Sequence, residues 1–280
     1  MNGKRSIFLM SALCFGFAFL YVPIMLVIIY SFNEGKLVTV WAGFSTKWYV
    51  ELFRDDAMID AAWNSLRIGL MSATLALAIG TPAGLVMSRF GRFRGRTLFS
   101  GMIAAPLVMP DVITGLSLLL LFVTMEQLVG WPAGRGMTTI VIAHTTFCAA
   151  YVAVVVQSRL AGMDTSIEEA AMDLGAKPTK IFFLITLPMI LPALMAGWLL
   201  SFTLSLDDLV ISSFVAGPGS TTLPMKVFSS VRLGVSPEIN ALATLIIVAI
   251  SILIIIASIL VMRSERQRTR QVQEDTGIPG

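Results

Sequence analysis

The chain has 280 residues, of which 56% are hydrophobic and only 13% are charged, and its mean hydropathy is +0.84. So few polar side chains cannot cover the surface of a soluble domain, so the composition excludes an ordinary soluble protein and predicts an all-α polytopic membrane protein. The formal net charge of +3 is explained by membrane topology and gives no reason to expect nucleic acid as a partner.

Six segments of the chain are apolar and long enough to cross about 30 Å of hydrocarbon as helices. No linker of consequence and no low-complexity tract separates them, so we expect one transmembrane domain over residues 1–280, with its core at about 61–262. The first segment is too long for a signal peptide, and we expect it to be retained. The six predicted spans are residues 7–30, 65–87, 98–121, 139–155, 189–215 and 241–262.

Lysine and arginine gather on one side of this predicted topology. With a cytoplasmic N-terminus, the inside segments hold most of the twenty Lys and Arg residues, as the positive-inside rule requires. The densest cluster runs from Arg89 to Arg96 in one short loop. The sequence therefore predicts cytoplasmic termini, a periplasmic loop at 31–64 and a cytoplasmic tail at 263–280.

The periplasmic loop contains aromatic and charged residues in close succession. Ser45 can cap a short helix whose Trp48, Leu52 and Phe53 fall on one side. An apolar stripe next to charged residues is typical of a helix that lies on a membrane surface. We therefore expect an interfacial helix on the outer face of the membrane.

The second and third spans contain glycine, proline and a carboxylate. Gly80 and Gly84 form a small-residue face, which most often indicates close packing of two helices. Asp111 follows Pro110 at about 20 Å from the cytoplasmic end of its span, at about 1.5 Å per residue, and so near mid-membrane. It is a candidate for a substrate path, although it can also serve as a structural partner for backbone amides that Pro110 frees.

The fourth span contains His144 between apolar stretches and beside two threonines. A histidine in that setting is more often an interhelical hydrogen-bond partner than a proton relay. The two cysteines, Cys14 and Cys148, both lie within predicted spans. No disulfide framework and no thiolate metal site is therefore indicated.

The loop between the fourth and fifth spans, residues 159–187, has the local signals of two short helices. Ser166 and Glu169 fit a capping box, in which each side chain bonds to the backbone at the other's position. Gly175 can end the first helix in a left-handed conformation, and Pro178 can start the second. We expect two helices that meet at Gly175.

The fifth span carries two serines and two adjacent aspartates near its end. Ser201, Ser205 and Asp208 share one helical face, at spacings of four and seven residues, whereas Asp207 points about 100° away from Asp208. An ionisable group in a span costs on the order of 2.5 to 3.5 kcal/mol, so such groups indicate function. The candidate path residues are Asp111, Asp207, Asp208, Ser201 and Ser205, and we expect at most one of the paired aspartates to face a lumen.

The spacing of residues in the loop resembles the EAA signature of permease subunits in bacterial ABC importers. The match consists of E-A-A, three residues, G, nine residues, I, one residue and L-P. The resemblance implies a type I importer permease fold, in which this loop forms a cytoplasmic coupling helix that sits in a cleft of the ATPase subunit. The residues assigned to coupling are Glu169, Ala170, Ala171, Gly175, Ile185, Leu187 and Pro188.

The stretches at 107–115 and 205–210 are similar to the polyamine branch of these permeases, and in particular to the second permease of putrescine importers. The resemblance implies a heterodimer with a related permease in the bacterial inner membrane, an ATPase dimer that binds ATP and magnesium, and a periplasmic polyamine-binding protein. It implies no cofactor on this chain. Buried carboxylates fit a dication physically, because a charge in a low-dielectric path needs a nearby opposite charge. Putrescine and spermidine are not separated by these residues.

Other functions are also compatible with parts of the sequence. An ABC importer permease for another solute, such as iron or thiamine, would have the same EAA loop. An ion-coupled secondary transporter could use the same aspartates but would not need that loop. A membrane enzyme is disfavoured, because the motifs H-E-x-x-H, G-x-S-x-G and C-x-x-C are absent from the sequence.

Overall fold

The computed structural model describes residues 3–37, 40–234, 237–252 and 255, and its regular structure there is helical apart from an isolated bridge between Asn33 and Phe44. The described residues fall into two compact units, one within 1–56 and 230–280 and the other within 57–229. The expectation of one transmembrane domain over residues 1–280 stays a prediction. The expected tail at 263–280 lies outside the described residues.

The first unit contains α1 (Gly3–Tyr30), α2 (Lys47–Leu52) and an apolar helix at Pro237–Ile252. The expected cap at Ser45 is wrong, because the N-cap of α2 is Thr46 and its side chain makes no capping bond. Ser45 Oγ, one position earlier, accepts a hydrogen bond from the Lys47 backbone at 3.2 Å. The expected interfacial face is only partly present. Trp48 is buried and its Nε1 donates to the Asn33 carbonyl oxygen at 2.6 Å, whereas Phe53 is exposed.

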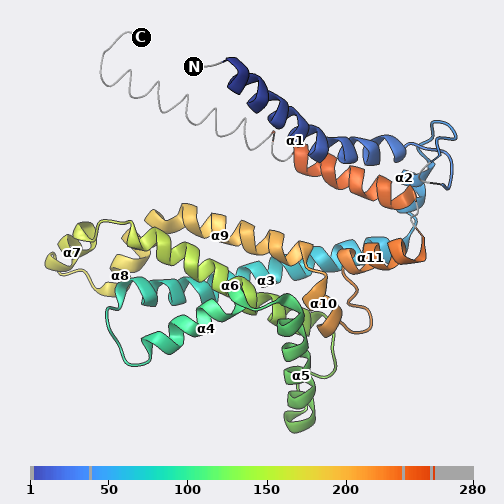
Figure 1. Cartoon of the computed structure of the whole chain (residues 1–280). Coiled ribbons are helices and arrows are strands. Elements are labelled where there is room, and N and C mark those ends of the chain that lie inside the picture. The colour runs from blue at the N-terminus through green and yellow to red at the C-terminus, as the bar shows by residue number, and fades with distance from the viewer. Residues whose placement is uncertain (1–2, 38–39, 235–236, 253–254, 256–280) are drawn as a thin grey trace. The chain divides into compact units, whose positions relative to one another are not determined.

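The second unit contains the helices that carry the candidate site. The long α6 is its most buried span and packs against α9 and α4, as Figure 1 shows for α9 and α6, which run alongside one another. The elements are α3 (Asp56–Arg89), α4 (Arg96–Val108), α5 (Asp111–Val129), α6 (Met137–Ala161), α7 (Ser166–Asp173), α8 (Pro178–Ile181), the π-helix η1 (Phe182–Thr186), α9 (Leu187–Asp207), α10 (Val210–Val215) and α11 (Leu223–Leu233), whose last residues belong to the first unit.

The glycine face on α3 packs closely against α6, which confirms the sequence prediction. A Cβ added at Gly80 would lie 2.7 Å from the Ala149 carbonyl oxygen, and one added at Gly84 would lie 2.6 Å from that of Ala153. Real Cβ atoms do not come so close to a carbonyl oxygen. Only hydrogen at these two positions lets the backbones of α3 and α6 approach to this distance.

The helices divide differently from the six predicted spans. The expected continuous helix at 98–121 is wrong, because α4 ends at Val108 and α5 starts at Asp111 and takes a different direction (Figure 1). Pro110 causes the break: it lacks an N–H group and forces Met109 out of the helical region, to a ψ of 136°. The described residues contain five helices long and apolar enough to span, at Phe8–Tyr30, Asp56–Arg89, Asp111–Val129, Met137–Ala161 and Pro178–Asp207.

The last two predicted spans also differ from the structure. The expected span at 189–215 is interrupted at Asp208, whose ψ of 123° is extended and separates α9 from α10. The expected span at 241–262 begins inside the shorter apolar helix at Pro237–Ile252, and most of its remainder lies outside the described residues. The number of spans is therefore not confirmed as six.

Candidate functional site

The two helix breaks meet at a cavity in the second unit. The end of α9 and the start of α5 both line it, and α10 packs against α5 beside it. The cavity has a volume of about 260 Å³, and its lining combines carboxylates with apolar and aromatic side chains, among them Phe147, Tyr151 and Leu204. Asp111, Asp207 and Asp208 all lie in this lining, so the structure brings the three candidate aspartates together.

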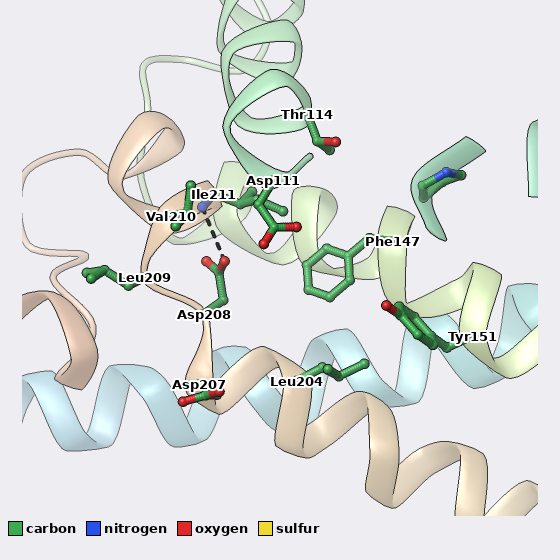
Figure 2. A pocket seen from close by; sticks show the side chains of 11 residues that line it. Asp111, Thr114, Phe147, Tyr151, Leu204, Asp207, Asp208, Leu209, Val210 and Ile211 are labelled. Carbon is green, nitrogen blue, oxygen red and sulfur yellow. Dashed lines mark hydrogen bonds between the residues drawn. The ribbon is translucent and has the colours of Figure 1, made fainter. Parts of the chain in front are cut away.

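Asp208 is held in place by hydrogen bonds from several directions. Its Oδ1 accepts from the Ile211 backbone at 3.2 Å, the bond drawn in Figure 2, and its Oδ2 accepts from the Ser212 backbone at 2.7 Å. The carboxylate thus satisfies N–H groups in the first turn of α10, where the helix dipole favours a negative charge. Asp208 therefore has a structural role at the break as well as a position in the cavity lining.

His144 is a further partner of Asp208 and comes from a different helix. It is fully buried on α6, and its Nε2 lies 3.1 Å from Asp208 Oδ2, while its Nδ1 lies 2.6 Å from Ser205 Oγ. Because a carboxylate only accepts hydrogen bonds, His144 Nε2 is the donor in the contact with Asp208. This geometry confirms His144 as an interhelical hydrogen-bond partner, which joins α6 to the break between α9 and α10.

Ser201 and Ser205 lie away from the cavity. Both are buried, and neither lines it. Ser205 bonds to His144, and the Ser201 carbonyl oxygen accepts a hydrogen bond from Cys148 Sγ at 3.4 Å. The helical face that these two serines share with Asp208 is therefore occupied by α6. The pattern on α9 predicted a shared face correctly, but that face is used for packing between helices.

Asp111 and Asp207 are exposed. Neither carboxylate has a hydrogen bond or an ion pair among the residues that the structure describes. Figure 2 shows Asp111 and Asp208 turned toward one another across the cavity, with the carboxylate of Asp207 directed away from that pair. The backbone amides after Pro110 do not bond to Asp111, since Ile113 N and Thr114 N donate to the Pro110 carbonyl oxygen instead. The alternative role of Asp111, as a structural partner for backbone amides that Pro110 frees, therefore has no contact to support it.

The start of α7 differs from the predicted capping box. The helix begins at Ser166, so Thr165 is the N-cap, and its side chain makes no capping bond. The Ser166 backbone N–H donates instead to Asp164 Oδ1 at 3.0 Å, and this hydrogen bond lowers the pKa of the Asp164 carboxyl. The capping box was wrong because Ser166 is already inside the helix, one position too late to cap it.

The end of α7 is as predicted. Gly175 has a φ of +82°, in the left-handed region. Its N–H donates to the Met172 carbonyl oxygen at 2.8 Å, and the Ala176 N–H donates to that of Ala171 at 3.0 Å. This pair of bonds is the Schellman motif that terminates helices. The next helix, α8, starts with Pro178 in its first turn.

The residues expected to couple to an ATPase are distributed over three elements. Glu169 and Ala170 are exposed on α7, and Leu174 just after it is 89% exposed. Ile185 lies in η1, and Leu187 and Pro188 form the first turn of α9. The EAA pattern therefore covers a surface helix, the turn after it and the first turn of α9.

Sequence reasoning missed the contact that attaches α7 to the rest of the unit. Glu168 Oε2 lies 3.2 Å from Arg89 Nε at the end of α3, and Thr186 Oγ1 in η1 donates to Glu168 Oε1 at 2.7 Å. In the sequence, Arg89 gives a signal only for topology, and Glu168 lies just before the EAA signature. No local signal pairs residues 79 positions apart, so only the fold could reveal this contact.

Comparison with known proteins identifies relatives over most of the chain. The family model described as "Binding-protein-dependent transport system inner membrane component" matches residues 80–270. The chain is 66% identical over 261 residues to the putrescine transport system permease protein PotI of Escherichia coli (strain K12), covering 93% of each chain. It is 44% identical over 250 residues to the spermidine/putrescine transport system permease protein PotC of the same strain, covering 89% of this chain and 91% of PotC.

Solved structures share the fold at low sequence identity. A bacterial ABC transporter involved in the import of the acidic polysaccharide alginate matches with a TM-score of 0.69 at 19% identity, over 93% of this chain and 97% of that one. The MetNI methionine ABC transporter matches with a TM-score of 0.60 at 19% identity, over 74% of this chain and 95% of that one. At this identity the likeness concerns the fold alone.

Proposed function

The chain belongs to the family of binding-protein-dependent transport system inner membrane components, and from that premise we propose that it is a permease subunit of an ATP-driven importer of polyamines. The observation that carries the proposal is the 66% identity with a putrescine permease over 93% of the chain. The 44% identity with a spermidine/putrescine permease supports the same substrate class. In this role the chain is a transport subunit, and ATP is hydrolysed by a separate protein.

The partners follow from the same proposal. An ATPase dimer, which binds ATP and magnesium, docks at α7 in the cytoplasm, a second related permease completes the membrane part, and a periplasmic polyamine-binding protein delivers the substrate. Exposure of Glu169, Ala170 and Leu174 on and after α7 supports docking there. An alginate transporter of the same fold, at 14% identity and a TM-score of 0.69, is described in complex with a periplasmic protein.

The cavity at the helix breaks is the proposed path of the cation. Asp111 is the principal carboxylate, because it lines the cavity, has no hydrogen-bond partner among the described residues and is turned toward Asp208, whereas the carboxylate of Asp207 is directed away (Figure 2). An ammonium group that has lost its water needs such a negative charge. The side chains of Phe147 and Leu204 offer an apolar surface to methylene groups beside it. Broken helices around a polar site are a common arrangement in transporters, and they support movement by alternating access.

Uptake by the purified assembly tests the proposal. The permease is reconstituted in liposomes with its partner permease, ATPase and binding protein, and entry of labelled putrescine and spermidine is measured with and without internal ATP. We expect saturable uptake that requires ATP and that excess unlabelled polyamine inhibits. Uptake of iron or thiamine in place of polyamine, or polyamine uptake driven by an ion gradient without ATP, would contradict the proposal and support one of the alternatives.

A further inference from the structure

Among the described residues, one side chain makes the polar contacts of α7 with other helices of its unit. Within the described residues, Glu168 is the only α7 side chain that forms a hydrogen bond or an ion pair with another helix. The helix has only eight residues and ends at the left-handed Gly175. So short a helix has little stability of its own. Its position is therefore set by the few contacts that it makes.

The three residues involved come from three separate elements. Arg89 is the last residue of α3, Glu168 lies in the first turn of α7, and Thr186 is the last residue of η1, directly before α9. Both carboxylate oxygens are used. Oε1 accepts from Thr186 Oγ1 at 2.7 Å and from Arg89 Nη2 at 3.3 Å, and Oε2 lies 3.2 Å from Arg89 Nε. One carboxylate thus connects α7 to the cytoplasmic ends of two long apolar helices.

The surroundings make this contact stronger than an ordinary surface ion pair. The side chains of Arg89 and Glu168 are 19% and 14% exposed, and Thr186 is buried. Partial burial reduces screening by water and by salt, so the attraction is larger than that of an exposed pair. Removal of one partner also leaves the other charge partly buried without compensation, which is costly. The contact can therefore transmit a displacement without coming apart.

The element next to Thr186 is irregular. Residues Phe182–Thr186 form a π-helix between α8 and α9, and such turns occur often at functional sites. Thr186 is the last residue of this π-helix, and regular α-helical geometry begins again at Leu187. The hydrogen bond from Thr186 therefore connects Glu168 to the start of α9. A shift of α7 would act on the start of α9 through this bond, in addition to the backbone connection through α8.

Glu168 and Glu169 are adjacent, so their side chains point about 100° apart on the helix. Glu168 is directed to α3 and η1, whereas Glu169 is exposed and has no polar partner among the described residues. We propose that Glu168, held by Arg89 and Thr186, is the positioning residue that transfers movement of α7 to both α3 and α9. The inference depends on the proposed function, in which Glu169 faces the ATPase.

Replacement of Arg89 by alanine tests the inference. The Arg89→Ala variant keeps the whole of α7 and the exposed Glu169, so the ATPase should still copurify in normal amount and hydrolyse ATP. Uptake per ATP hydrolysed should fall by about tenfold, the order expected for loss of a charged hydrogen bond. Arg92→Ala is the matched control, because it removes an exposed arginine from the following loop and should leave this ratio unchanged.

The double variant distinguishes loss of the specific interaction between Arg89 and Glu168 from a general disturbance of the structure. If Arg89 and Glu168 act through one another, Arg89→Ala combined with Glu168→Ala should lower the ratio no further than Glu168→Ala alone. Glu168→Gln, which keeps an oxygen for Thr186 but loses the charge, should fall between wild type and Glu168→Ala. An unchanged ratio in Arg89→Ala, or loss of the ATPase from the complex together with uptake, would overturn the inference.

The wild-type assembly, measured in the same assay, distinguishes failure of the inference from failure of the proposed function. If wild type takes up polyamine with ATP and Arg89→Ala does so with the same ratio, the inference alone fails. If wild type takes up no polyamine, the proposed substrate fails. The inference is then decided by the coupling of ATP hydrolysis to the binding protein, whose addition should stimulate hydrolysis equally in wild type and in Arg92→Ala and by a smaller factor in Arg89→Ala.

Discussion

At the scale of single residues, the three membrane aspartates have different surroundings. The cost of a carboxylate in a span was enough to select Asp111, Asp207 and Asp208 from the sequence. Their separate roles depend on contacts between residues that are far apart in the sequence, such as His144 and Asp208. The sequence alone does not show these contacts. Asp208 is bound on both oxygens, and Asp111 has no hydrogen bond within the described part of the chain. The structure therefore distinguishes a fixed carboxylate from an available one.

This difference predicts different effects of the same substitution on the yield of the complex. Asp111→Asn keeps the shape of the side chain but removes its charge, so polyamine uptake should fall about tenfold or more while the yield of the complex is unchanged. Asp208→Asn places a donor opposite either the Ile211 N–H or the Ser212 N–H and His144, so both yield and uptake should fall. Glu126→Gln, on the same helix but outside the cavity, is the control and should transport normally. Normal uptake by Asp111→Asn would exclude it from the path.

At the scale of elements, local chemistry predicted some boundaries and not others. The end of α7 at Gly175 and the start of α8 at Pro178 follow from residues within one turn of each boundary. The break before α5 was missed because hydropathy continues across it, although Pro110 restricts Met109 in a way that the sequence alone contains. The break at Asp208 has no proline, and it depends on the bonds that α10 and His144 supply.

The close approach of α3 and α6 gives a prediction about stability. Gly80→Ala places a Cβ 2.7 Å from the Ala149 carbonyl oxygen, so the two helices must separate, at a cost of about 1–3 kcal/mol. The thermal midpoint of the purified complex should fall. Gly101→Ala in α4 is the matched control, because its Cβ would find no atom within 4 Å, and its midpoint should stay the same or rise. An equal loss in both variants would indicate an effect of helix chemistry rather than of packing.

The exposed face of α7 gives a prediction about coupling. Glu169→Ala removes a side chain that makes no hydrogen bond within the described residues, so folding and membrane insertion should be unaffected. If Glu169 contacts the ATPase, uptake should fall about tenfold or more, or the ATPase should no longer copurify. Both are measured in membranes that contain equal amounts of permease. Normal transport by this variant would mean that the coupling surface of α7 lies elsewhere.

At the scale of the whole molecule, composition and charge were the most informative signals. A hydrophobic fraction of 56% requires a membrane environment, and the structure has five helices long and apolar enough to span it among the described residues. Hydropathy located these helices but not their interruptions, since it averages over windows longer than one turn. The positions of lysine and arginine predict the orientation, which packing within the chain does not specify.

Orientation is therefore the last prediction, and exposed positions on both sides of the membrane test it. In a background without Cys14 and Cys148, single cysteines at Lys36, Ala133 and Thr221 should react in intact cells with a thiol reagent that cannot cross the membrane. A cysteine at Arg92 should react only after the cells are opened, because the basic loop is retained in the cytoplasm. All four positions are exposed, so a difference in labelling reports the side of the membrane and not burial within the protein. Labelling at position 92 in intact cells, with no labelling at the other three, would reverse the topology and place α7 where no cytoplasmic ATPase could reach it.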